Sequence, residues 1–115
     1  MAYYMLQAAF ADVSWTAMAR KPQDRMEAFR PVVEKAGGKL VGYWFSLGEY
    51  DSLVIVEVPD NVSAASLSIA VTAGGAFKAL KTTALLTAKE GAEAMKAAAS
   101  LMQTPEYKAS RKPLG

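Results

Sequence analysis

The 115-residue chain contains neither cysteine nor histidine. Without cysteine it has no disulfide, no thiol nucleophile and no thiolate metal site. Without histidine it lacks the commonest general base, the commonest metal-binding side chain and the usual proximal ligand of haem. These two absences argue against zinc hydrolysis, Ser-His-Asp catalysis and ordinary haem chemistry, and we expect neither a metal nor a cofactor.

The chain also lacks a strong excess of charge and any long apolar run. Its 13 basic and 11 acidic residues give a net charge of +2, whereas nucleic-acid binding usually needs basic residues gathered into a stripe. No uninterrupted apolar run reaches the length of a membrane span. The apolar N-terminus has no basic residue before Arg20, which fits a secretory signal poorly. We therefore expect a cytoplasmic, bacterial-type protein with no nucleic-acid and no membrane partner.

Apolar side chains are abundant enough for one folded domain, since 52% of the residues are hydrophobic and 21% are charged. Apolar residues that alternate with polar ones predict strands, and apolar residues at helical spacing predict helices. Together they predict the order β-α-β-β-α-β, followed by one more helix. We therefore expect an α+β, ferredoxin-like fold, in which an antiparallel sheet carries two helices on one face. The predicted strands and helix starts are, in chain order, 3–10, Pro22, 39–48, 51–59, Asp60-Asn61, 77–86 and Thr87.

The C-terminal part divides into a helix and a tail. We assign residues 1–103, including the last helix, to a single domain and residues 104–115 to a basic tail. The tail carries Lys108, Arg111 and Lys112. Because chain ends are usually solvated or draped over an interface, we prefer that role to a phosphate site.

The predicted hairpin over residues 40–59 sorts its side chains onto two unlike faces. With Glu49 and Tyr50 as the turn, Trp44 lies opposite Ile55, and residues directly opposite share a face. Glu-Tyr is not a favoured two-residue turn, so a longer loop with a bulge would shift these pairs. The face expected under the helices carries Val41, Tyr43, Phe45, Val54, Val56 and Val58. The second face carries Trp44, Asp51, Leu53, Ile55 and Glu57, with Gly42 opposite Glu57.

This second face is apolar at its centre, where Trp44, Leu53, Ile55 and Met5 gather. Helices on one side of the sheet would leave it in water, and a contiguous apolar patch usually marks a partner or a ligand. Since most oligomers are homomeric and symmetric, we expect two such sheets to pack face to face. A cavity between the sheets, or between sheet and helix, is the natural place for a small molecule.

The residues LGEYD, ending at Asp51, carry a family resemblance. Three segments match in order: EKAGGKLVGYWFSLGEYD (34–51), VIVEVPDNVSAASLSIAV (54–71) and KTTALLTAKE (81–90). The chain resembles the GYD-domain family of small bacterial proteins. The resemblance implies a ferredoxin-like fold of the dimeric α/β-barrel kind and implies no catalytic residue. The chain departs from the family pattern at AFKA (76–79), which affects the start and register of the last strand.

Three residues around the turn are candidate ligand-binding residues. Asp51 is suited to a ligand, but accepting backbone amides is the commoner role of Asp in turns. Tyr50 has two equally supported roles, pointing its hydroxyl at a ligand or sealing the end of the core. Trp44 is more simply an anchor in a dimer interface than a stacking platform for an aromatic ligand.

Glu57 is the fourth candidate ligand-binding residue. It lies in a strand between Val and Ile, where burial would raise its pKa and suit it to acid or base chemistry. An ion pair with Lys78 or Lys81, across the sheet or an interface, is the preferred alternative.

Two functions from different classes follow. The leading one is a homo-oligomeric module that binds a small molecule or serves an interaction role, without demonstrable chemistry. The alternative is a cofactor-independent enzyme of isomerase or monooxygenase type, acting on a small activated or aromatic substrate in a cavity at the sheet face. The enzyme requires a carboxylate and an aromatic hydroxyl at one cavity. A ligand-sensing domain of a regulator is a third reading, but the chain lacks a DNA-reading element.

Overall fold

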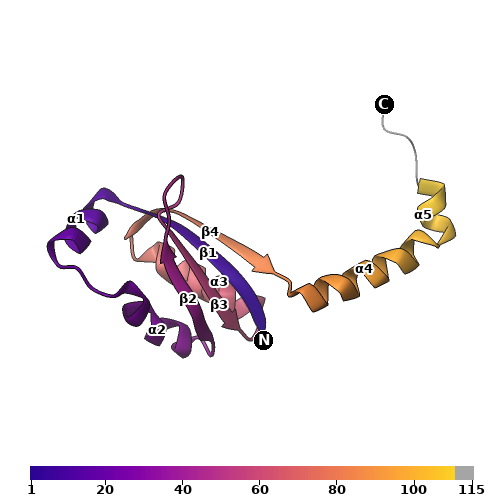
Figure 1. Cartoon of the computed structure of the whole chain (residues 1–115), viewed down its shortest axis with the longest axis horizontal. Helices are drawn as coiled ribbons and strands as arrows, with labels where there is room; N and C mark the ends of the chain where they lie inside the picture. Colours follow the sequence, from indigo (N-terminus) through magenta and orange to yellow (C-terminus); the bar gives the residue numbers. More distant parts are fainter. Residues whose placement is uncertain (111–115) are drawn as a thin grey trace. The chain divides into compact units, whose positions relative to one another are not determined.

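The computed structural model of the chain describes residues 1–110 (Figure 1). The predicted tail residues Arg111 and Lys112 lie outside the described part. The chain forms two compact units, Met1–Leu85 and a second that begins at Leu86. Within residues 1–110, no helix combines the length and apolar character needed to cross a membrane.

The first unit contains a four-stranded antiparallel sheet and three helices. The strand order is β2-β3-β1-β4, so the two central strands are not consecutive in sequence. The unit is therefore α+β, and its strand order is consistent with the predicted ferredoxin-like arrangement. The elements are β1 (Ala2–Phe10), α1 (Asp12–Arg20), α2 (Arg25–Lys35), β2 (Lys39–Phe45), β3 (Ser52–Val58), α3 (Asn61–Ala73) and β4 (Phe77–Leu85).

One face of the sheet, here called the helix face, packs against α2 and α3. Every second residue of β1 and β3 points to it, as the period of a strand requires. The helices contribute Val33 from α2, and Ala64 and Leu67 from α3. The buried sheet residues on this face are Tyr4, Leu6, Ala8, Leu40, Ser52, Val54, Val56 and Val58.

The hairpin register differs from the predicted one by two residues. Trp44 lies opposite Leu53 and Gly42 opposite Ile55, because the strands are joined by a loop over 46–51 rather than by a two-residue turn. The Ser46 amide donates to the Asp51 carbonyl over 2.8 Å, which closes this longer loop.

A bulge in β2 between Leu40 and Gly42 changes which residue is buried. The bulge places one extra residue on the strand and reverses the facing beyond it. Leu40 is buried, whereas Val41 is 46% exposed. The prediction that Val41 lies under the helices is wrong for this reason. Phe45 was also expected there, but it stands at the end of the strand and is 53% exposed.

The helix starts follow their capping residues. Asp60 caps α3 as predicted, by accepting a hydrogen bond from the Ser63 amide. The predicted start at Pro22 is wrong, because Asp24 accepts from the amides of Met26 and Glu27 and begins α2 there.

The start of β4 contains the irregularity expected at AFKA (76–79). Ala9 pairs with Ala79, and Phe10 pairs with Phe77, which leaves Lys78 as an extra residue. A bulge bends and twists the strand locally.

The second unit contains α4 (Ala88–Met102) and α5 (Pro105–Ser110). The predicted capping box is present, since the Glu90 amide donates to the Thr87 hydroxyl over 3.1 Å and the Glu90 carboxylate accepts from the Thr87 amide over 2.9 Å. Helix α5 was not predicted, because it begins where the tail was assigned. The domain boundary at residue 103 stays a prediction.

Candidate functional site

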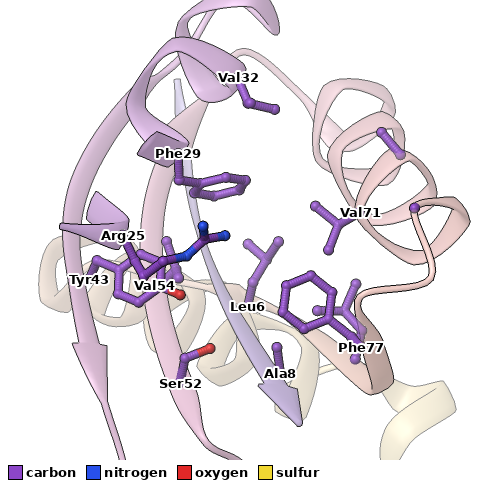
Figure 2. A pocket seen from close by; sticks show the side chains of 13 residues that line it. Leu6, Ala8, Arg25, Phe29, Val32, Tyr43, Ser52, Val54, Val71 and Phe77 are labelled. Carbon is purple, nitrogen blue, oxygen red and sulfur yellow. The ribbon is translucent and has the colours of Figure 1, made fainter. Parts of the chain in front are cut away.

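A half-enclosed cavity lies between the helix face of the sheet and helices α2 and α3, inside the first unit (Figure 2). Its volume is about 280 Å³. Strand residues form one wall, and α2, α3 and the start of β4 supply the others. The apolar lining includes Leu6, Phe29, Val54, Val71 and Phe77.

Arg25 is the single charged residue that lines this cavity. It is the first residue of α2, and Figure 2 shows its guanidinium pointing into the same space as the rings of Phe29 and Phe77. Its Nε atom is buried and has no hydrogen-bond partner among the described residues. A buried donor without an acceptor is unfavourable, so this atom is ready to bind an acceptor that enters the cavity.

Arg30, one turn further along α2, is a useful contrast. Its guanidinium donates to the Glu27 carboxylate over 3.1 Å. The hydrogen bond and the charge of Glu27 raise the pKa of Arg30 above its ordinary value. Helix α2 thus carries one arginine with an internal acceptor and another whose Nε lacks one.

Two hydroxyl-bearing residues also line the cavity. Ser52 stands on the helix face of β3 among valines and is 1% exposed, which makes it the one polar residue recorded as buried in the described part. Tyr43 stands on the neighbouring strand, opposite Val54. The cavity is therefore mostly apolar with a few polar groups, which is the usual composition of a small-molecule site.

A second cavity of about 340 Å³ shares Arg25 and Phe77 with the first. It is lined by α1 and the segment before α2, and it adds Lys21 and Gln23. Among the described residues, no acidic one lines either cavity. The shared boundary of the two cavities is therefore positively charged.

None of the four predicted site residues lines these two cavities. Asp51 binds backbone instead. Its Oδ2 accepts from the Phe10 amide over 2.9 Å, and its amide donates to the Ala8 carbonyl over 2.8 Å. Asp51 thereby fastens the hairpin loop to the end of β1. The neighbouring carbonyl of Tyr50 accepts from the Ser46 hydroxyl over 2.7 Å.

Trp44 and Glu57 lie on the other face of the sheet, here called the open face. The Trp44 indole lies across Gly42, so close that a Cβ added to this glycine would stand 2.2 Å from Cη2 of the ring. Trp44 itself is 54% exposed. Glu57 lies opposite Lys39 on β2 and Tyr3 on β1.

Within the described residues, Arg30 and Glu27 form the ion pair, and Glu57 is not paired with Lys78 or Lys81. In the same part of the chain, no group of three or more acidic residues is placed to hold a metal ion.

Sequence reasoning missed Arg25 and Ser52. Arg25 occupies an apolar position of its helix, in the i, i+4, i+7 series with Phe29 and Val32, and all three line the cavity. Ser52 is the first core-facing position of β3, and valine occupies the next three. Each is a polar residue where the helix or strand periodicity predicts an apolar one. That mismatch was the signal in the sequence for a polar group at a buried site.

The chain was compared with curated proteins and with models of protein families. No curated protein matches the chain. The sequence model of the GYD domain, however, matches residues 4–95, which include the hairpin, both cavities and most of the first unit. The chain therefore belongs to the GYD domain family.

Proposed function

We propose that this protein is a homo-oligomeric module that binds a small, mostly apolar molecule in the cavity between the helix face and helices α2 and α3, without catalysing a reaction. The observation that carries this proposal is the half-enclosed apolar cavity of about 280 Å³ with the polar groups of Arg25, Tyr43 and Ser52 at its lining. A largely apolar cleft with few convergent polar groups is the common form of a ligand site.

Binding is favoured over acid–base catalysis by the chemistry of the lining. Tyr43 supplies an aromatic hydroxyl, but no carboxylate and no histidine lines the cavity. A general acid or base must reach the reacting atom within hydrogen-bond distance. Asp51 is engaged with the Phe10 amide, and Glu57 stands on the open face. The isomerase or monooxygenase alternative therefore lacks, at this cavity, the carboxylate that it requires beside the aromatic hydroxyl.

The open face supports the oligomeric part of the proposal. Its central row, Gly42–Ile55–Met5–Thr83, is uncharged. One flanking row carries Glu57 with Lys39 opposite it, and the other carries Lys81. A second copy packed face to face about a two-fold axis would cover the apolar row and bring Glu57 of one chain towards Lys81 of the other. Such packing would be the dimeric α/β-barrel arrangement.

The ligand site is tested by nuclear magnetic resonance with a neutral probe. Isotope-labelled protein is titrated with 2-phenylacetamide, and we expect saturable shifts at Leu6, Val54 and Val71. The variant Val71→Trp fills the cavity and should abolish them. Ile69→Trp is the matched control, because Ile69 is on the same helix, is exposed and does not line this cavity. Shifts confined to the open face, or none, would refute the proposed site.

A further inference from the structure

We infer that the cavity selects a small apolar carboxylate, whose charged end binds the Arg25 guanidinium and whose apolar body lies among Leu6, Phe29 and Val71. This inference rests on the ligand-binding function proposed above and names the chemical class of the ligand.

The unpartnered Nε atom of Arg25 is the first argument. A carboxylate accepts two parallel hydrogen bonds from a guanidinium, a geometry that lysine does not offer. Arg30 already has such an acceptor in Glu27, but Arg25 has no ion pair within the described residues. In apolar surroundings the attraction between opposite charges is stronger than in water. An anionic ligand would therefore satisfy a group that the chain itself leaves unsatisfied.

The arrangement of charge around Arg25 gives the charged end a place. Arg25 stands where the two cavities meet, and Lys21 lines the second cavity. Neither lining contains a carboxylate to compete for these cations. The N-terminus of α2 is not the anion site, because Asp24 already accepts from the amides of Met26 and Glu27. The Arg25 guanidinium is therefore the group that would bind the carboxylate of the ligand.

The size and lining of the cavity limit the rest of the ligand. Sites for drug-sized molecules measure about 300–1,000 Å³, whereas this cavity measures about 280 Å³. A single aromatic ring or a short alkyl chain is the appropriate size. The hydroxyl of Ser52 and that of Tyr43 offer further hydrogen bonds to a carboxylate oxygen or to a polar substituent.

The test compares matched acids and amides by calorimetry and by nuclear magnetic resonance. The pairs are phenylacetate with 2-phenylacetamide, and hexanoate with hexanamide, all at neutral pH. Because hydrogen bonds to charged groups are worth roughly 1.5–3 kcal/mol, we expect each acid to bind about ten- to a hundredfold more tightly than its amide. Arg25→Gln should remove this preference and retain amide binding. Arg30→Gln should leave the preference unchanged.

The possible outcomes separate the two proposals. Equal affinities for acid and amide, with shifts at Leu6 and Val71, would overturn the charge selectivity and leave the ligand-binding function standing. Absence of binding by both pairs would overturn both. If Arg25→Gln does not fold, the acid-to-amide ratio of the unmodified protein still decides, and Lys21→Gln, on the exposed segment before α2, should reduce that ratio severalfold while the fold is kept.

Discussion

The two faces of the sheet are built from neighbouring residues of the same strands and have different surroundings. On the helix face, Leu6 pairs with Val54, and both are almost fully buried under α2 and α3. On the open face, one residue along, Met5 pairs with Ile55, and both remain partly accessible. Both pairs are apolar, so at these positions composition does not distinguish the faces. What covers each face does.

This difference assigns the two proposed roles to opposite sides of one sheet. The helix face holds a half-enclosed cavity with the unpartnered Nε of Arg25, which suits a small ligand. The open face is broad and apolar at its centre, with Glu57 and Lys81 in the flanking rows, which suits a second copy. Variants that change one face alone therefore test the roles separately.

The largest effect is expected from Leu6→Ala on the helix face. Removing a buried leucine costs about 2–5 kcal/mol of unfolding free energy, because apolar contacts are lost and a cavity is left. Met5→Ala is the matched variant on the open face. The stability lost in Met5→Ala should grow with protein concentration, because association would bury the part of Met5 that is still accessible. Urea unfolding at several protein concentrations measures both. If both variants lose the same unfolding free energy at every protein concentration, the two faces do not differ in the way proposed.

The approximate positions of the strands and the caps of α3 and α4 were predictable because local signals determine them, whereas the start of α2 was not predicted at Asp24. Alternation fixed β1, and the capping residues of α3 and α4 bind amides within their own first turns. The hairpin register was not predictable in the same way. It depends on the bond from Ser46 to Asp51 and on the anchoring of Asp51 to β1, a strand about forty residues away in sequence. The bulge at Val41 likewise belongs to the pairing of two strands, not to either strand alone.

The candidate cavity was beyond the reach of sequence patterns because its walls come from separate elements. Arg25, Ser52 and Phe77 line one cavity only after α2 has packed on the sheet that contains β3 and β4. The predicted candidates clustered in the hairpin, where the motif is conspicuous. There Asp51 has a structural partner, and Trp44 belongs to the open face.

The next largest effect is expected from Trp44→Ala on the open face. The Trp44 ring covers Gly42 of the central row. Because a tryptophan buried in an interface commonly contributes about 2 kcal/mol or more, self-association should weaken about thirtyfold. Sedimentation velocity measures the change. Leu47→Ala is the control, since Leu47 is fully exposed in the hairpin loop and lies off the sheet. If the unmodified protein is a monomer, or if Leu47→Ala has the larger effect, the open face is not the interface.

Asp51 stands at the end of the sheet and should affect stability rather than either binding role. Asp51→Ala leaves the Phe10 amide without its acceptor, at a cost of about 1–3 kcal/mol. Glu49→Ala, in the exposed part of the same loop, should stay within about 0.5 kcal/mol of the unmodified protein. Urea unfolding gives both values. A weaker affinity for 2-phenylacetamide with unchanged stability would instead make Asp51 a ligand residue.

The smallest effect is expected at acid pH, from the exposed cap residue Asp60 at the start of α3. The amide and hydroxyl of Ser63 donate to Asp60 and lower the pKa of that carboxyl below its ordinary value of 3.8. Because the folded-state pKa is the lower one, this contribution to stability is present above pH 3.8 and is lost as the pH falls through the folded-state value.

Urea midpoints of the unmodified protein and of Asp60→Asn, measured from neutral to acid pH, test this directly. Asparagine still caps the helix but carries no charge, so the difference between the two midpoints should be constant near neutrality and shrink below pH 3.8. Ser63→Ala removes the hydroxyl donor and keeps the amide, and it should reduce the pH dependence without abolishing it. A difference that is constant across the whole range would show that Asp60 stabilises α3 without its charge.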